Sequence, residues 1–259
     1  MKPLYKTYVA VMFVFLLAPV LLVIPMSFSA DRFMTWPPSG LSLRWYVELA
    51  RQPALAEAAR NSLVLGLVVT ALALAIAIPA ALALARHRVP FAAPILALLT
   101  APLLLPTIVL ALALLIVFVA AGLLGTWPGL VLAHLMITLP YALRVLLTAL
   151  ATLPDGLEDA AATLGATPRQ VLRRITLPLM LPGLVATAAI TFLISFDEVV
   201  ISLFVVGPRL TTLPVALFHY VESRTDPLVA AVSALLVLLT LAVVFILERA
   251  IGLTRAVSR

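Results

Sequence analysis

The sequence predicts an all-α integral membrane protein with six transmembrane helices, and three observations lead to this fold class. Of the 259 residues, 64% are hydrophobic, whereas soluble domains hold roughly 45–50%. The mean hydropathy is +1.21, and no soluble fold has enough interior to hide that much apolar surface. The apolar residues also gather in six runs, each able to cross a hydrocarbon core of about 30 Å as a helix. We therefore expect a single transmembrane domain over residues 1–259.

The expected spans are residues 8–29, 62–85, 92–121, 128–150, 181–206 and 228–251. The first follows two lysines, as the apolar part of a signal peptide does, and residues 27–29 could mimic a small-residue cleavage site. The run is about twenty residues long, however, which suits a span better than a signal peptide, so an uncleaved helix is expected. In the third and longest run, Pro102 and Pro106 predict a kink.

The first extramembrane segment covers residues 30–61 and carries aromatic residues that suit the membrane–water interface, namely Trp36, Trp45 and Tyr46. Ser42 is placed to cap a short helix that would lie along the membrane surface. A plain connecting loop with an aromatic anchor is the alternative.

Basic residues in the short loops predict the orientation of the chain, because they accumulate on the cytoplasmic side. With a cytoplasmic N-terminus, the inner side would hold ten of them: Lys2, Lys6, Arg86, Arg88, Arg169, Arg173, Arg174, Arg249, Arg255 and Arg259. The outer side would hold six: Arg32, Arg44, Arg51, Arg60, Arg209 and Arg224. The excess predicts that the N-terminus lies in the cytoplasm. With six spans both termini must lie on the same side, so the C-terminus is expected there too. The pI of about 10.3 then reflects topology signals and headgroup contacts rather than binding to nucleic acid.

Several kinds of chemistry are excluded by composition. The chain has no cysteine, and His87, His134 and His219 are too far apart in sequence to form a metal-spaced pair, so no metal site is expected. No lysine follows Lys6, and a nucleotide-binding P-loop needs one. No plausible Ser-His-Asp arrangement is found either. We expect a protein that is not an enzyme and that would borrow any ATP-driven motor from a partner.

Residues 152–176 form the one informative segment that does not belong in lipid. Asp155 and Glu158 are spaced as a capping box, and Gly165 supplies a helix stop. An apolar stripe at helical spacing lies between them, formed by Leu157, Ala160, Ala161 and Leu164. A second helix is predicted at once, with Thr167 as its cap and Pro168 in the first position. This helix–glycine–helix elbow has an exposed small apolar face, which favours a protein partner over a linker that packs on its own bundle.

The run from Glu158 to Ala166, continued by Leu177 and Pro178, resembles the EAA loop of binding-protein-dependent ABC importer permeases. Asp159 stands where that family has its glutamate, and either Asp159 or Glu158 could serve as the acid. The resemblance implies that the elbow couples the permease to its ATPase through Glu158, Asp159, Ala160, Ala161, Leu164, Gly165, Ala166, Thr167, Leu177 and Pro178.

The same resemblance implies a type I importer architecture, with the coupling elbow on the cytoplasmic side between the fourth and fifth helices. It implies a multi-pass protein of the bacterial inner membrane. The expected partners are two ATPase subunits that bind ATP and magnesium, a second and different permease chain, and an extracytoplasmic substrate-binding protein. No cofactor is expected in this chain.

A narrower resemblance covers residues 194–214, where Ser195 to Val200, Gly207 with Pro208, and Thr212 to Pro214 look like the second permease of spermidine/putrescine importers. It implies a polyamine or a related small cationic amine as the substrate. Permeases for aminobutyrate, aminoethylphosphonate and opines look alike and remain alternatives. From composition alone a channel or a secondary transporter also stays open, and only the elbow argues against them.

Asp197 and Glu198 are the only acids well inside an expected span, which makes them functional candidates. On one continuous helix, Glu198 shares a face with four hydroxyl residues: Thr187, Thr191, Ser195 and Ser202. We expect this row to line the substrate path, with Glu198 meeting a cationic group, while Asp197 pairs with a neighbouring helix or subunit. The alternative is that the hydroxyl groups bond to their own helix and let a neighbour pack closely.

Overall fold

The computed structural model describes residues 3–86, 89–154 and 156–251, and the elements in these ranges are helical apart from two isolated bridges. Four of the described helices are long and apolar enough to cross a membrane, or up to six if each of two bent helix pairs forms one span. The all-α prediction is confirmed. Several residues used in the predictions lie outside the described residues, namely Lys2, His87, Arg88, Asp155, Arg255 and Arg259.

The contacts divide the chain into two compact units, and the first comprises Met1–Ala58 and Ala216–Val244. Its helices are α1 (Pro3–Ser27), α2 (Arg44–Ala50), the first residues of α3 (Pro53–Arg86), most of α12 (Leu213–Ser223) and most of α13 (Leu228–Ile251). The sixth span is found where it was predicted, whereas α3 begins nine residues before the predicted 62. The short helix α2 is confirmed, but Leu43 is its N-cap, and Ser42 Oγ accepts a hydrogen bond from the Arg44 amide at 3.2 Å.

Asp31 organises the loop between α1 and α2. Its carboxylate accepts hydrogen bonds from the hydroxyl and the amide of Ser39, the amide bond being 2.9 Å long. The Thr35 hydroxyl donates a further bond at 2.9 Å, and the Ser29 hydroxyl another at 3.1 Å. The bond from the Ser39 hydroxyl, followed by those from the Ser39 amide and Thr35, lowers the pKa of Asp31 to about 2, because each favours the charged form.

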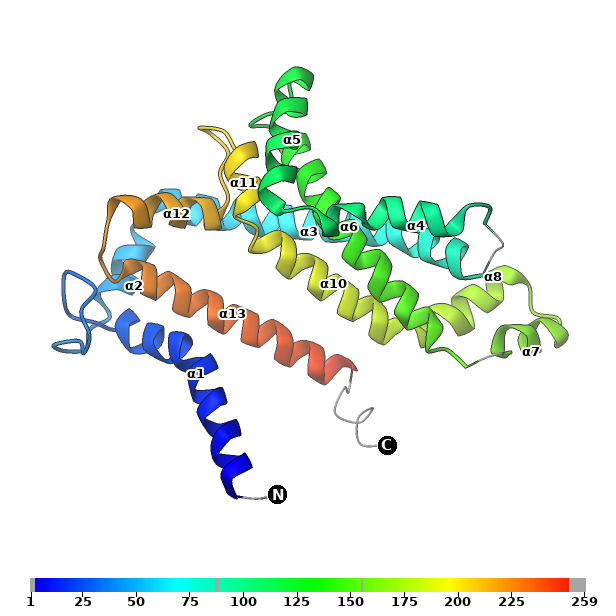
Figure 1. Ribbon diagram of the computed structural model, residues 1–259, viewed down its shortest axis with the longest axis horizontal. Coiled ribbons are helices and arrows are strands. Elements are labelled where there is room, and N and C mark those ends of the chain that lie inside the picture. Colours follow the sequence, from blue (N-terminus) through cyan, green and yellow to red (C-terminus); the bar gives the residue numbers. More distant parts are fainter. Residues whose placement is uncertain (1–2, 87–88, 155, 252–259) are drawn as a thin grey trace. The chain divides into compact units, whose positions relative to one another are not determined.

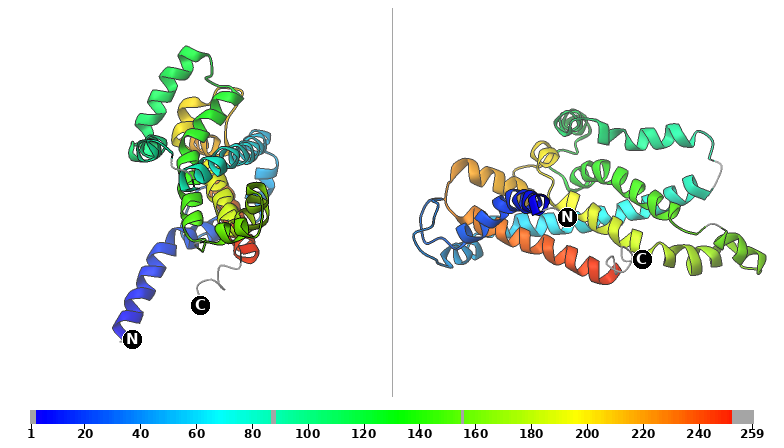
Figure 2. Two further views of the ribbon diagram at one scale, coloured as in Figure 1. Left: turned by 90° about the vertical axis from the view of Figure 1, so that its right-hand side faces the viewer. Right: turned by 60° about the horizontal axis from the view of Figure 1, so that its bottom comes forward.

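The second unit comprises Ala59–Val215 and Phe245–Arg259. It holds the rest of α3, then α4 (Ala92–Thr100), the 3₁₀ turn η1 (Ala101–Leu104), α5 (Thr107–Ala121), α6 (Trp127–Ala151), α10 (Leu181–Phe196) and α11 (Val200–Val205). Helix α6 runs beside α10, and α11 packs on α5 and α6 (Figures 1 and 2). Two buried apolar clusters fill this unit, one around Leu65, Leu130 and Ile201, the other around Leu146 and Met180.

The prolines of the third run bend the chain where a kink was predicted, but far more sharply. The segments Ala92–Leu104 and Thr107–Ala121 meet at 102°. Pro106 is the N-cap residue of α5, with φ of −55° and ψ of 128°. Proline has no amide hydrogen and disfavours a helical conformation in the residue before it, so the helix ends and a new one begins.

The prediction of one continuous helix over residues 181–206 is wrong. Helix α10 ends at Phe196, and α11 begins at Val200. One physical reason lies in the side chain of Glu198, whose Oε1 accepts a hydrogen bond from the Ile201 amide at 2.9 Å. Such a bond satisfies an amide at a helix start, so the polar residues 197 and 198 form a break between two helices rather than a turn inside one.

Helices α6 and α10 approach closely where their small residues meet. A Cβ atom added to Gly183 would lie 2.4 Å from Cβ of Ala149. Neither side could accept that distance without moving, so a glycine at this point permits the two backbones to come together, as is common between membrane helices.

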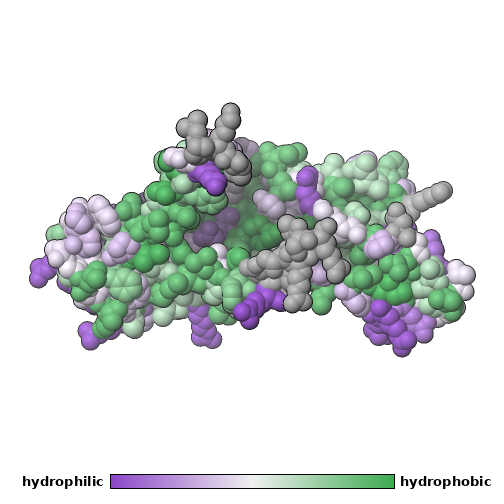
Figure 3. Space-filling model, turned by 90° about the horizontal axis from the view of Figure 1, so that it is seen from below, coloured by the Kyte–Doolittle hydropathy of each residue, from purple (hydrophilic) through white to green (hydrophobic). Residues whose placement is uncertain are grey.

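Hydrophobic side chains cover much of the surface seen in Figure 3. On α1 they include Val14, Phe15 and Leu16, which are more than half exposed. A surface of this kind is suited to lipid or to a partner helix and unsuited to water.

Candidate functional site

The elbow is built as the glycine and capping patterns predict. Helix α7 (Leu157–Thr163) is followed by Leu164 and then by Gly165, whose φ of +87° lies in the left-handed region. Helix α8 (Pro168–Val171) begins at a complete capping box: the Thr167 side chain accepts from the Gln170 amide, and the Gln170 side chain accepts from the Thr167 amide. The π-helix η2 (Leu172–Thr176) and α9 (Leu177–Leu179) then lead to α10.

The first predicted capping box is not found. Asp155 lies outside the described residues, and the N-cap of α7 is Gly156, which makes no side-chain cap. The Glu158 carboxylate forms other contacts, and its Oε2 lies 3.1 Å from Nε of Arg86 at the end of α3. Its Oε1 accepts a hydrogen bond from the hydroxyl of the buried Thr176 in η2 at 2.7 Å. Two partners distant in sequence therefore hold the carboxylate that was expected to cap the helix.

The predicted apolar stripe of the elbow is exposed apart from the half-buried Ala161. Helix α7 contains no buried residue, and the Leu164 side chain beyond it is 89% exposed. The alternative of a linker packed on its own bundle does not fit a leucine so fully uncovered. Asp159 is likewise exposed, so of the two acids it is the one placed to meet another protein, while Glu158 is held within the chain.

The two acids of the fifth run lie together at the break between α10 and α11. Asp197 is exposed, and Glu198 is half-buried with its carboxylate on the start of α11. The four hydroxyl residues of the predicted row do not share an open face with Glu198. They are all buried within this chain, namely Thr187, Thr191, Ser195 and Ser202. The expectation of one continuous face is wrong because the helix is interrupted between Ser195 and Ser202.

His134 is the site residue that the sequence reasoning missed. It lies on α6, its side chain is fully buried, and both ring nitrogens are engaged. Nδ1 is 2.9 Å from the Ser195 hydroxyl on α10, and Nε2 is 3.0 Å from the Ser202 hydroxyl on α11. The available signal was a histidine in the middle of an apolar run, because a buried polar side chain requires partners. Its partners are 61 and 68 positions away and could not be named in advance.

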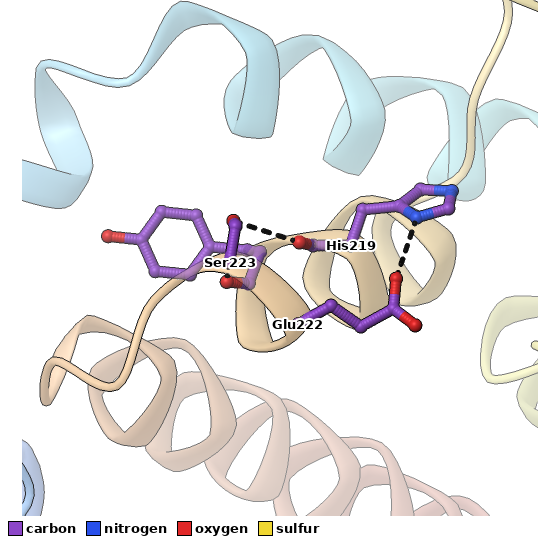
Figure 4. Close-up of polar contacts among 4 residues, drawn as sticks. His219, Glu222 and Ser223 are labelled. Carbon is purple, nitrogen blue, oxygen red and sulfur yellow. Dashed lines mark hydrogen bonds and ion pairs between the residues drawn. The ribbon is translucent and has the colours of Figure 1, made fainter.

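The other described histidine lies in a separate, exposed cluster on α12 (Figure 4). Nδ1 of His219 is 3.4 Å from Oε2 of Glu222, and the Ser223 hydroxyl donates to the His219 carbonyl at 3.1 Å. These contacts are local ones along a single helix. Within residues 3–86, 89–154 and 156–251, no group of three or more acidic residues and histidines could hold a metal ion.

Comparisons with known proteins agree with this architecture. The family model of binding-protein-dependent transport system inner membrane components matches residues 73–252. The spermidine/putrescine transport system permease protein PotC of Haemophilus influenzae is 33% identical over 243 residues, which cover 93% of each chain. The putrescine transport system permease protein PotI of Escherichia coli is 34% identical and covers 86% of this chain and 82% of the relative. A solved chain of the MetNI methionine ABC transporter in inward facing conformations is 24% identical, with a TM-score of 0.63 over 79% of this chain and 96% of that chain, and shows the same fold.

Proposed function

The chain belongs to the family of binding-protein-dependent transport system inner membrane components, and we propose that it carries polyamines through the membrane as one permease of an ATP-driven importer. It is a multi-pass permease subunit and not an enzyme. Among its relatives, the polyamine permeases match at 31–34% identity over most of the chain. A substrate of that class would carry two or more ammonium groups separated by methylene spacers.

The observation that carries the substrate proposal is the pair of carboxylates at the break in the fifth span. Within the membrane an acid is costly unless it faces a cavity or a partner. Asp197 is exposed, and its carboxylate makes no hydrogen bond or ion pair with another described residue, whereas Glu198 is committed to the start of α11. These facts support an exchange of the roles expected from the sequence: Asp197 meets an ammonium group, and Glu198 fixes the break that displays it.

The elbow supplies the coupling to ATP. We assign α7, Leu164 and Asp159 to the surface that docks on the ATPase subunit, because they are exposed and together form an apolar face beside an acid. ATP and magnesium are bound by that subunit. The orientation with both termini in the cytoplasm rests on the excess of basic residues in the predicted inner loops.

The complete importer, in this proposal, contains two ATPase subunits, this chain, a second and different permease chain, and an extracytoplasmic binding protein. The six spans of this chain would form half of the transmembrane pathway, and the second permease would form the other half. Native mass measurement of the purified complex tests the subunit composition, and a functional homodimer of this chain would contradict it.

The substrate is tested with the whole complex in liposomes. Uptake of radiolabelled putrescine and spermidine would be measured with the cognate binding protein and ATP, beside aminobutyrate and aminoethylphosphonate as competitors. Transport of the polyamines, with no inhibition by the other two, is the expected result. Transport of a neutral or anionic solute in their place would refute the polyamine assignment and leave the family membership standing.

A further inference from the structure

We infer that His134 is a positioning residue, whose imidazole ties α10 to α11 across the break and so sets where Asp197 and Glu198 stand. This inference rests on the proposed function for its consequence in transport, but its geometry is independent of the substrate. Ser195 lies two residues before Asp197, and Ser202 lies four residues after Glu198. The two hydroxyl groups bonded by His134 therefore bracket the acid pair.

The bridge uses the full hydrogen-bonding capacity of the ring. A neutral imidazole has one N–H donor and one acceptor nitrogen, and at 2.9 Å and 3.0 Å both nitrogens of His134 are within ordinary bonding distance of a serine. One serine therefore donates to the ring and the other accepts from it. The two nitrogens hold fixed positions in a rigid planar ring, so the bridge fixes a distance between the helices.

Helix α11 depends on such a contact for its orientation. It has only six residues, and a helix that short is not stable on its own. Ile201 and Val205 are fully buried in the apolar cluster and hold it against the core. Apolar contacts are not directional, whereas hydrogen bonds are. The bond from His134 to Ser202 therefore selects the rotation of α11, and with it the direction in which Glu198 and Asp197 leave the break.

The position of His134 on α6 makes the tie firm. Its backbone carbonyl accepts a hydrogen bond from the Thr138 hydroxyl at 2.7 Å, within the same buried helix. Helix α6 packs along α10, so it provides a fixed reference for both sides of the break. The bridge therefore joins three elements of one unit, namely α6, α10 and α11.

The test uses the complete importer in liposomes and the absence of native cysteine in this chain. The Val199→Cys variant places a half-buried thiol at the break. The rate at which a cationic methanethiosulfonate reagent modifies this thiol measures how accessible the thiol is. Mass spectrometry of this chain follows the modification. We expect Ser202→Ala or His134→Leu to raise this rate about fivefold, which corresponds to the loss of one ordinary hydrogen bond. Polyamine uptake should fall by a similar factor while the complex still assembles.

Two further variants distinguish positioning from packing. His134→Gln keeps a donor and an acceptor and should retain part of the uptake that His134→Leu loses. Thr100→Val removes a buried hydroxyl of α4, which bonds to the Leu96 carbonyl at 2.9 Å and takes no part in the bridge, and should change neither the modification rate nor the uptake. If the His134→Leu complex does not assemble, the Ser202→Ala variant, which lacks only one oxygen atom, tests the inference instead.

Two outcomes would overturn the inference. One is an unchanged modification rate in assembled Ser202→Ala complexes. The other is faster modification with uptake unaffected, which would reduce the bridge to a packing contact. A substrate other than a polyamine would contradict the proposed function alone, because the modification rate is measured without any substrate.

Discussion

Glu158 of α7 and Arg86 at the end of α3 form an ion pair, with 3.1 Å between Oε2 and Nε. The same carboxylate accepts a hydrogen bond from Thr176, just before the fifth span. One side chain of the elbow is thus bonded to the end of α3 and to η2, the segment that leads through α9 into α10. Any movement of α7 would be transmitted to both of them through these contacts.

Removing this ion pair should weaken coupling more than stability. Both side chains are about one-third exposed, at 35% and 30%, and a pair of that kind contributes less than about 1 kcal/mol. Arg86→Gln and Glu158→Gln should each assemble normally but transport fewer molecules per ATP hydrolysed. The double variant should be no worse than either single one, because the same interaction is lost. Additive losses in the ratio of uptake to hydrolysis would show that the two residues act separately.

Leu164 should be a principal anchor for the ATPase. At 89% exposed it contributes little to the stability of this chain, but a charge in its place would be buried at the interface without a partner. Leu164→Asp should leave the thermal unfolding of the isolated permease unchanged and abolish co-purification of the ATPase subunit. Leu41→Asp is the matched control, since Leu41 is 77% exposed in the loop before α2. Normal ATPase recovery with Leu164→Asp would place the docking surface elsewhere.

The two acids at the break should respond differently to neutral substitution. Asp197→Asn removes a charge that no described residue engages and should lower polyamine uptake about tenfold or more, as loss of a charged hydrogen bond does. Glu198→Gln keeps an oxygen that can accept from the Ile201 amide and should be milder, whereas Glu198→Ala removes the cap and should impair assembly. Initial uptake rates and complex yields for the three variants check this order. A stronger effect of Glu198→Gln than of Asp197→Asn would restore the roles that the sequence suggested.

The contact between α6 and α10 should tolerate an exchange of its small residues. Gly183→Ala places two Cβ atoms 2.4 Å apart, and such overpacking costs about 1–3 kcal/mol. Its thermal unfolding midpoint in detergent should fall accordingly. The double variant Ala149→Gly with Gly183→Ala moves the methyl group to the other helix and should recover most of the loss. Equal midpoints for the single and double variants would contradict the close approach.

The loop held by Asp31 should loosen only in strong acid. The pKa of this carboxyl is lowered to about 2 by its hydrogen bonds, from an ordinary value of 3.8. The stability it contributes is therefore fully present above about pH 4 and is lost as the pH falls through about 2. Hydrogen exchange at the Ser39 amide, corrected for its intrinsic rate, should show protection down to about pH 3 in the wild type. Asp31→Ala removes the acceptor oxygens and should abolish that protection at every pH.

Several elements of the fold could be predicted because their signals are local. The apolar length of residues 128–150 and 228–251 sufficed to place α6 and α13 within one residue at each end. The capping box at Thr167 and the glycine stop at Gly165 were likewise found as predicted. The capping box and the glycine stop each depend on residues no more than four positions apart.

The errors arose where a distant contact decides the local structure. A helix through residues 197–199 has no proline or glycine to oppose it, so hydropathy alone favoured a continuous span. The break is supported by the His134 bridge and by burial of Ile201, neither of which is visible in the sequence around it. The sequence led to Glu158 being assigned to a cap because its partner Arg86 lies 72 positions away, and no local pattern predicts that contact.

Helix α1 can be stable in the membrane without the buried core that the other helices form. None of the residues in its 18-residue apolar window is buried in this structure, so this helix does not depend on packing against the described chain. It can enter the bilayer as a stable span while the later helices are still being synthesised, since its backbone bonds are satisfied internally. Helices such as α6 and α10 have polar residues that need each other and settle only once both are inserted. The burial pattern therefore favours insertion of α1 as an independent span, whereas α6 and α10 depend on each other.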